Sequence, residues 1–517
     1  MRVAQKRLSR TQVTRTASIP APVGGINDRD SLAEMPAKDA VLLGNWWPRP
    51  SKLEVRKGSI NWVTGFPGSV ETLVEYLPPV GVAKLFAGSG GGIYDVTNSG
   101  SLNAPAVSGQ TNNRWQPSQI VTSAGNYLYL FNGVDKPQLY DGTTWRAVDA
   151  ASAPAITGVT TSLLVQGCLF KARLWMVETN STRAWYLPAS SVGGLATSFD
   201  LGAVFRLGGY LVGMFSWTLD AGSGLDDLAV FISSNGECAV YKGTDPNSAA
   251  TFSLIGVYSL GRPIGRRCAV KFGGDLLVVL EEGVYPLGKA LLSSSIDHQS
   301  AVTDKIQNSI SQAVVSYRAN FGWEPTLYPE QAMLILNIPA GNGTNFQYAW
   351  NAITSAWTKF TGWDARTFCA ANAGLFFGDS NSVKKAWTGN LDGAATIQFD
   401  ALCSFQFFGS QTQNKFFTMV RPYLQSSGTP SILYGLNGNF ISTDPVGVLN
   451  YTPPTGMTWG AMTWGSMAWG GSLTGLTNWN TVGGVYNSAA IRLKGQSNGA
   501  SLEWTATDFA YQQAGII

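Results

Sequence analysis

From about Ser51 to about Trp387, the chain repeats a pattern of short apolar runs, each of which ends at a Gly, Asn or Asp turn. Runs of β-branched and aromatic residues that are this short predict antiparallel strands joined by tight turns. Corresponding hairpins recur at roughly 40–50 residues, a spacing typical of propeller blades. We therefore expect an all-β chain with an irregular β-propeller-like body over residues 51–395.

The expected hairpins are spread over this whole body. The first joins Lys84–Phe86 to Ile93–Val96 across Gly91 and Gly92. The others are Tyr127–Phe131 with a strand ending at Tyr140, Leu169–Val177 with Arg183–Leu187, Ala229–Ser233 with Glu237–Tyr241, Asp275–Leu280 with Gly283–Pro286, Ala332–Ile338 with Gln347–Trp350, and Leu375–Phe377 with Lys384–Trp387.

One segment has the period of a helix instead. Apolar residues recur at intervals of three and four at Ile306, Ile310, Ala313, Val314 and Tyr317. Thr303 stands where an N-cap is expected, and Asp304 follows it in the first turn. The pattern predicts a single isolated helix near residues 303–317, which braces the sheets.

The two ends of the chain follow other patterns. Residues 1–50 predict an extended N-terminal arm, with a short helix that opens at Pro36 and closes at Gly44. After about Thr396 the strands become longer and alternate, as in Ile491–Lys494, which predicts a sheet with one buried and one polar face. We assign residues 396–517 to a C-terminal β-platform domain resembling a β-sandwich.

Composition points to an assembly. Hydrophobic residues make up 44% of the chain and charged residues only 13%, so much of the surface must be apolar or neutral. Such a surface favours burial against other subunits. The net charge of +3 does not indicate a dedicated nucleic-acid surface, and no apolar run approaches the roughly 20 residues of a membrane span. Five scattered cysteines predict free thiols and folding in a reducing cytoplasm.

The sequence contains no convincing catalytic, metal or cofactor site. A serine-histidine-acid site would have to use the one histidine, His298, but the sequence has no convincing Gly-x-Ser-x-Gly motif for the nucleophile. No phosphate-binding loop is present. Glu281 and Glu282 are adjacent before Gly283, which predicts a solvated hairpin turn instead of a glycosidase pair. The carboxylates of Asp220–Asp227 lack the ligand alternation of a calcium loop. We expect a chain that is not an enzyme.

Tryptophan is the residue most suggestive of binding. Trp459, Trp464 and Trp469 recur every five residues in a Gly-rich stretch, and Trp46 and Trp47 are adjacent. Large aromatic residues in such loops serve as anchors in protein interfaces or fill a core, although they can also stack on sugars. We take these five as candidate interface residues. The basic residues of the first fifteen positions could neutralise phosphates or form a solubilising tail, and the sequence leaves both possibilities open.

Three sets of segments occur in one order along the chain. The first comprises Pro22–Asp30 (PVGGINDRD), Met35, Pro36, Ala40, Asn45–Pro48 (NWWP) and Val55–Gly58 (VRKG); the second comprises Ser234–Glu237 (SNGE), Val240–Pro246 (VYKGTDP), Gly261–Arg267 (GRPIGRR) and Gly273–Asp275; the third comprises Phe417–Pro422 (FTMVRP), the tryptophan repeats and Leu502–Asp508 (LEWTATD). Together they resemble the phage stabilisation or tail nozzle proteins of short-tailed bacteriophages.

This resemblance implies a structural protein of the virion tail, made and folded in the host cytoplasm. It implies a ring, a homohexamer, below the portal and adaptor proteins, which retains the genome and then passes double-stranded DNA during ejection. Other tail components such as a fibre, spike or needle are further expected partners. The alternative is a carbohydrate-recognising propeller or receptor-binding tail protein, and a divergent enzyme of the glycosidase or sialidase type is a more distant rival.

Overall fold

The structure is a computed structural model that describes residues 13–220, 225–290, 300–341, 343–371, 374–449 and 474–514. The chain divides into two compact units. The propeller unit comprises Ser59–Ala349 and Thr361–Thr388, and the platform unit comprises Met1–Gly58, Trp350–Phe360 and Gly389–Ile517. These limits differ from the sequence-based ones of 51–395 and 396–517, because the arm and a short internal segment join the C-terminal strands.

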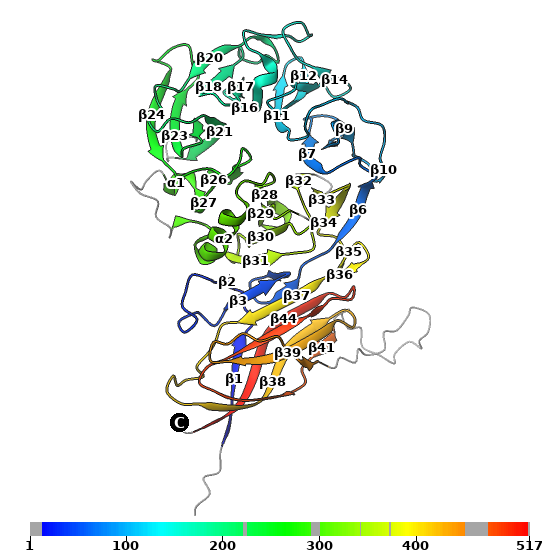
Figure 1. Cartoon of the computed structure of the whole chain (residues 1–517), viewed down its shortest axis with the longest axis vertical. Helices are drawn as coiled ribbons and strands as arrows, with labels where there is room; N and C mark the ends of the chain where they lie inside the picture. The colour runs from blue at the N-terminus through cyan, green and yellow to red at the C-terminus, as the bar shows by residue number, and fades with distance from the viewer. Residues whose placement is uncertain are drawn as a thin grey trace, which may run out of the picture. The chain divides into compact units, whose positions relative to one another are not determined.

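The propeller unit confirms the predicted fold class. Five blades are separate antiparallel sheets of three or four strands, which Figure 1 shows around a ring. Blades 1 and 5 have three strands each. Blade 1 contains β7 (Val70–Tyr76), β8 (Lys84–Ser89) and β9 (Gly92–Asp95), and blade 5 contains β25 (Ala269–Phe272), β26 (Asp275–Leu280) and β27 (Gly283–Pro286).

Blades 2, 3 and 4 have four strands each. Blade 2 contains β11 (Gln116–Thr122), β12 (Gly125–Phe131), β13 (Gln138–Tyr140) and β14 (Trp145–Ala147). Blade 3 contains β16 (Leu164–Phe170), β17 (Arg173–Glu178), β18 (Arg183–Tyr186) and β20 (Thr197–Asp200), and blade 4 contains β21 (Leu211–Asp220), β22 (Leu225–Ser233), β23 (Glu237–Gly243) and β24 (Phe252–Ser259).

Two further groups of strands complete the ring. Blade 6 contains β28 (Glu324–Tyr328), β29 (Met333–Ile338) and β30 (Phe346–Asn351), and blade 7 contains β32 (Thr367–Ala371), β33 (Gly374–Gly378), β34 (Ser382–Ala386) and β6 (Ser59–Thr64). The last of these strands comes from the start of the unit and pairs antiparallel with β34. Strands from the two ends of the propeller sequence therefore share one blade. The short strands β10 (Gly100–Ser101), β15 (Ile156–Thr157) and β19 (Gly194–Leu195) form parallel bridges.

Apolar side chains fill the spaces between successive blades. Trp175 of blade 3 packs against Phe231 of blade 4, with ring centroids 5.8 Å apart. Phe376 of blade 7 shares a cluster with Leu73 of blade 1, so the core continues across the point of closure. Burial of such large side chains is the main favourable contribution to folding. Each blade thus depends on its neighbours for its core.

The platform unit consists of two sheets. One contains β4 (Trp46–Pro48), β5 (Leu53–Val55), β44 (Leu502–Gln513), β38 (Lys415–Ser426) and β41 (Thr474–Leu476), with β1 (Thr14–Pro20) on β44 and β42 (Asn480–Tyr486) on β38; the other contains β31 (Ala356–Phe360), β3 (Asp39–Gly44), β37 (Gln398–Cys403), β43 (Ala489–Gln496), β39 (Ser431–Gly438) and β40 (Gly447–Val448), with β2 (Gly25–Ile26) on β3. The strands β35 (Leu391–Asp392) and β36 (Ala395–Thr396) form a small hairpin.

The N-terminal arm differs from the prediction in one respect. The prediction of a short helix between Pro36 and Gly44 is wrong, because Asp39–Gly44 forms β3 and pairs with β37. Pairing with a strand far along the chain overrides the local cap-like signals at its two ends. The rest of the described arm combines short strands with turns, and β1 runs antiparallel to β44 from Thr14 opposite Gln512.

The predicted helix is present as α2 (Gln307–Tyr317), preceded by a 3-10 turn from Asp304 to Ile306. Its buried residues are Ile310, Ala313 and Val314, as the period indicated. Thr303 does not cap it, because its Oγ1 accepts a hydrogen bond from the backbone N–H of Val284 at 3.0 Å. The only other described α-helix is the short α1 (Leu287–Ala290), and within the described ranges no helix has the length and hydropathy of a membrane span.

Candidate functional site

Trp46 and Trp47 lie in the core of the platform unit, where both are completely buried. The ring of Trp46 lies 5.0 Å from Phe399 and 5.9 Å from Trp504, so it joins the two sheets. Trp47 packs against Phe360 at 6.0 Å. The structure gives both residues a role in the core instead of the predicted interface role. The other three candidates, Trp459, Trp464 and Trp469, lie outside the described residues.

An exposed face of β38 is the surface best suited to contact a partner, although the sequence analysis did not single it out. Side chains along this strand alternate between buried and exposed, and a bulge between Phe417 and Met419 shifts the alternation by one residue. Phe416 is 43% exposed and faces Val485 of β42, which is 46% exposed. Directly opposed residues project from the same side of a sheet. Together with Arg421, Tyr423 and Trp479, these residues form what we call the β38 face: Phe416, Met419, Arg421, Tyr423, Trp479 and Val485.

Arg421 organises the polar part of the β38 face. Its guanidinium stacks over Trp479 at 4.6 Å and over Tyr423 at 5.1 Å. It also pairs with Asp508 at 2.6 Å, and the Tyr423 hydroxyl donates to the same carboxylate at 2.7 Å. Partial burial acts to raise the pKa of Asp508, but the hydrogen bonds from Arg421 and Tyr423 outweigh it and lower that pKa. The carboxylate therefore holds these side chains in place at neutral pH.

The propeller has a pocket on its axis. Its volume is about 300 Å³, and it is lined by the first strands of blades 1 to 6. These strands contribute Thr72, Gln116, Cys168, Ser216, Lys271 and Glu324, and Arg266 and Arg267 enter from the segment just before β25. We call this the axial pocket. Pockets in propellers form where the innermost strands surround the central channel.

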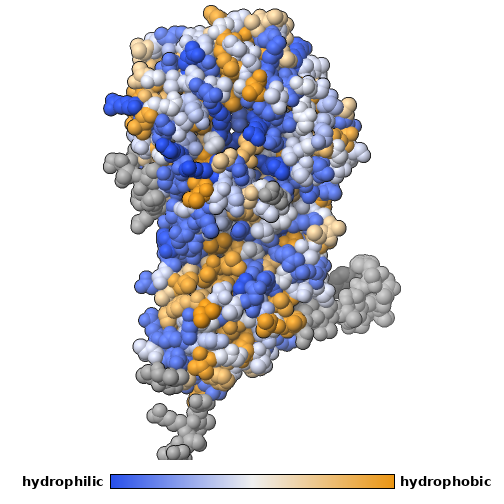
Figure 2. Space-filling model, in the orientation of Figure 1, coloured by the Kyte–Doolittle hydropathy of each residue, from blue (hydrophilic) through white to orange (hydrophobic). Residues whose placement is uncertain are grey.

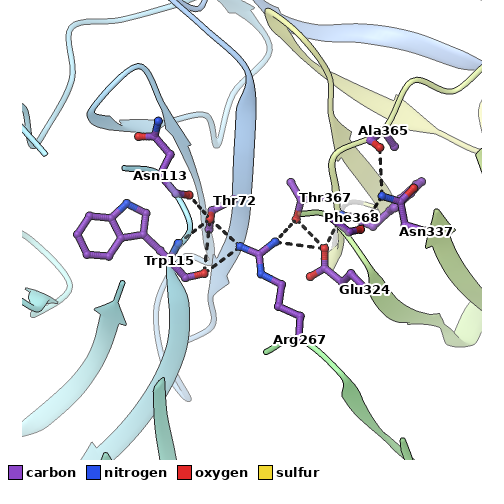
Figure 3. A network of polar contacts seen from close by, with 10 residues as sticks. Thr72, Asn113, Trp115, Arg267, Glu324, Asn337, Ala365, Thr367 and Phe368 are labelled. Carbon is purple, nitrogen blue, oxygen red and sulfur yellow. Dashed lines mark hydrogen bonds and ion pairs between the residues drawn. The ribbon is translucent and has the colours of Figure 1, made fainter. Parts of the chain in front are cut away.

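Arg267 connects five blades through hydrogen bonds and an ion pair at the edge of the axial pocket (Figure 3). One terminal nitrogen, Nη1, lies 3.3 Å from Glu324 and donates to the Thr367 hydroxyl at 3.1 Å. The other, Nη2, donates to the Thr72 hydroxyl at 2.8 Å and to the Trp115 carbonyl at 3.0 Å. Its side chain is only 8% exposed. These contacts come from blades 1, 2, 6 and 7, while Arg267 itself leads into blade 5.

Arg266 and Lys271 carry positive charge into the same pocket without a paired carboxylate. Nη1 of Arg266 donates to the carbonyls of Leu211 and Val212 at 3.3 and 3.0 Å, and neither Arg266 nor Lys271 forms an ion pair with any described residue. Burial lowers the pKa of Arg266, which reflects the cost of holding its charge there. The pocket thus holds three cations and one carboxylate, which is already engaged by Arg267.

Cys168 is the one thiol that lines the axial pocket. Cys168 as a residue is partly exposed, whereas Cys238, Cys268 and Cys403 are buried. The interior position raises the pKa of Cys168 to about 11, although Lys271 and a hydrogen bond from Ser216 act in the opposite direction.

We therefore expect the alkylation rate of Cys168 to rise about tenfold for each unit of pH between 7 and 10, because only the thiolate reacts. Peptide mass spectrometry after timed exposure to iodoacetamide measures this rate, and the Cys168→Ser variant identifies the peptide signal. An ordinary thiol with a pKa near 8.5 would level off above about pH 9, so a plateau there would contradict the described environment.

The residues considered for catalysis do not form a catalytic arrangement within the described ranges. Glu281 and Glu282 form the turn between β26 and β27, which confirms the predicted hairpin. Glu281 pairs with Arg318 of the segment after α2 at 3.2 Å. His298 and the acidic turn around Gly222 lie outside the described residues, and no group of three possible metal ligands occurs among the residues that are described.

Comparison with known proteins gives no family assignment. No family model matches the chain, and no curated protein matches its sequence. A solved structure of BBS1N in complex with ARL6DN is 9% identical, with a TM-score of 0.38 over 64% of this chain and 98% of that chain. A structure described as the extracellular domain of a hybrid two-component system from B. thetaiotaomicron is 10% identical, with a TM-score of 0.39 over 61% of this chain and 40% of that chain.

An exo-β-1,3-galactanase from Phanerochaete chrysosporium, solved with galactose, is 11% identical, with a TM-score of 0.25 over 76% of this chain and 95% of that chain. At such low identities, no function can be transferred from these proteins.

Proposed function

We propose that this chain is a structural, non-enzymatic protein of the virion of a short-tailed bacteriophage. In this proposal it forms the tail nozzle, a ring below the portal and adaptor proteins that retains the genome and then passes double-stranded DNA during ejection. Its partners are other copies of itself and neighbouring tail proteins, and its location is the tail of the virion.

The β38 face is the observation that carries the proposal. It exposes Phe416, Met419 and Val485 beside the stacked side chains of Arg421 and Trp479. Aromatic residues, Met and Arg are the types enriched in protein interfaces and among the residues that contribute most to binding. Figure 2 shows apolar residues gathered over the strands of the platform unit as well. We infer that this face contacts the next subunit of a ring, since head-to-tail contacts around a rotation axis close into rings.

The segments that resemble tail nozzle proteins contain residues on which the fold depends. Gly25 has a φ of +80°, and a Cβ there would lie 2.5 Å from the backbone nitrogen of Trp357. Gly243 has a φ of +133°, and a Cβ there would lie 1.8 Å from the carbonyl oxygen of Thr251. No other residue type fits these positions without moving the backbone. The near-neutral charge also suits a wall along which DNA must slide, because every phosphate contact adds affinity.

The test is the mass of the particle that the full chain forms. We expect light scattering and electron microscopy to show closed rings, either of the purified chain or after it joins tail-less phage particles. Replacing both Phe416 and Val485 with Asp should abolish the ring, because each new charge would have to be buried in the contact. Val121 of blade 2, 56% exposed, provides the control, and Val121→Asp should leave the ring intact.

A chain that stays monomeric at every concentration and never joins such particles would rule the proposal out. If that monomer bound a neutral host polysaccharide, the alternative of a carbohydrate-recognising propeller would be favoured instead.

A further inference from the structure

The two neighbouring arginines of the axial pocket differ in what they contact. Arg267 uses both terminal nitrogens on protein groups, and Glu324 balances its charge. Arg266 donates to two backbone carbonyls through Nη1 alone, which leaves the hydrogens of Nε and Nη2 without a partner among the described residues. An arginine has five N–H donors. The Arg266 guanidinium also lies over the ring of Tyr210 at 5.3 Å, but no carboxylate pairs with it, so it keeps donors for a ligand at the pocket.

We propose that the axial pocket binds a small molecule carrying an oxyanion, a phosphate or carboxylate group, which Arg266 and Lys271 neutralise. A charge held away from water is costly unless an opposite charge or hydrogen bonds compensate it. Arg266 receives no such carboxylate from the described protein. Lys271 interacts electrostatically with Asp227, but the Asp227 carboxylate already forms an ion pair with Lys171 at 3.4 Å.

Gln116 offers a neutral polar side chain to the same pocket. Its residue is 8% exposed and lines the pocket, yet its side-chain amide forms no hydrogen bond with any described residue. Its amide atoms are not enclosed by protein, so their donor and acceptor are open to the pocket. An amide also offers both a donor and an acceptor to one ligand. Gln116 thus supplies the neutral polar contact that a small organic anion would use beside its charged group.

The size of the axial pocket limits the ligand. A volume of about 300 Å³ lies at the lower end of the range for small-molecule sites. It accommodates a phosphate ester or a sugar acid, but not a nucleic-acid duplex. The inference does not depend on the proposed function, because the pocket lies within the propeller unit and none of the residues of the β38 face contributes to it.

The experiment is a calorimetric titration of the full chain with inorganic phosphate and with glucuronate, at constant ionic strength, and with neutral glucose as the comparison. Constant ionic strength removes the effect of screening. We expect one phosphate or glucuronate per chain and no binding of glucose. Arg266→Gln and Lys271→Gln should each weaken binding at least tenfold. Arg262→Gln is the matched control, because Arg262 lies in the same segment, is exposed and does not line the pocket.

Alkylation of Cys168 gives a second measurement at the site itself. We expect bound phosphate to slow this alkylation in the parent chain and in Arg262→Gln, but not in Arg266→Gln. Because Lys271 is exposed, Lys271→Gln keeps the test decisive even if Arg266→Gln fails to fold. Absence of saturable binding at millimolar anion, or equal weakening by the Arg262 and Arg266 substitutions, would overturn the proposal. Tighter binding of phosphate or of glucuronate shows whether the natural ligand carries a phosphate or a carboxylate group.

Discussion

Replacing Arg267 with methionine is expected to lower the free energy of unfolding by about 3–5 kcal/mol, the cost of leaving the partner of a buried ion pair uncompensated. Glu324, whose side chain is 18% exposed, would keep its charge without the guanidinium, and the Trp115 carbonyl would lose a donor. Calorimetry and denaturant titration of the full chain measure the change.

Two further variants separate the ion pair from general effects of the substitution. Arg262→Met removes an exposed arginine a few residues away and should change stability by less than about 0.5 kcal/mol. Adding Glu324→Gln to Arg267→Met should recover part of the loss, because the unpaired carboxylate is then gone. If Arg267→Met unfolds like the parent chain, Arg267 does not hold the blades together.

Trp46→Ala should cost a similar amount, about 3–5 kcal/mol, because it opens a cavity in a closely packed core. The side chain is completely buried between Phe399 and Trp504 in the platform unit. Phe416→Ala is the comparison, since Phe416 is an aromatic residue of the same unit that is 43% exposed, and it should cost less than about 1 kcal/mol.

These two aromatic residues should also differ in assembly. Phe416→Ala is expected to weaken the proposed ring without unfolding the chain, whereas Trp46→Ala is expected to act through stability alone. Sedimentation at a temperature where both variants are folded distinguishes the two effects. A Trp46→Ala variant as stable as the parent but unable to assemble would restore the interface role that the sequence suggested.

The hairpins were predictable where the sequence at the turn contains residues typical of turns, such as Gly, Asn or Asp. Leu280 pairs with Gly283 across the Glu281–Glu282 turn, as expected. The stretch Leu169–Val177 was expected to be a single strand, but it contains a two-residue turn at Lys171 and Ala172, with Phe170 opposite Arg173. Both turn residues have positive φ, a conformation that usually selects Gly or Asn. Without those residues, the sequence offers no sign of the turn.

The two candidate surfaces were harder to predict from the sequence than the fold. The β38 face depends on the bulge after Phe417, which breaks the simple alternation that would have grouped its residues. The axial pocket collects side chains from six blades, so it requires knowledge of how the blades close. Trp46 and Trp47 were assigned to an interface because aromatic residues suit both interfaces and cores. Only the pairing of β4 with β5, which in turn pairs with β44, decides between the two roles.

The pairing of β6 with β34 sets a condition on how the chain folds during synthesis. Val63 finds its partner, Val383, only 320 residues later. Closing so long a loop carries an entropic cost that local hairpins do not have. Until the ribosome has released β34, strand β6 has no blade to join and offers an open edge to other chains. Correct closure therefore comes after nearly the whole propeller has been made, and a truncated chain would expose that edge.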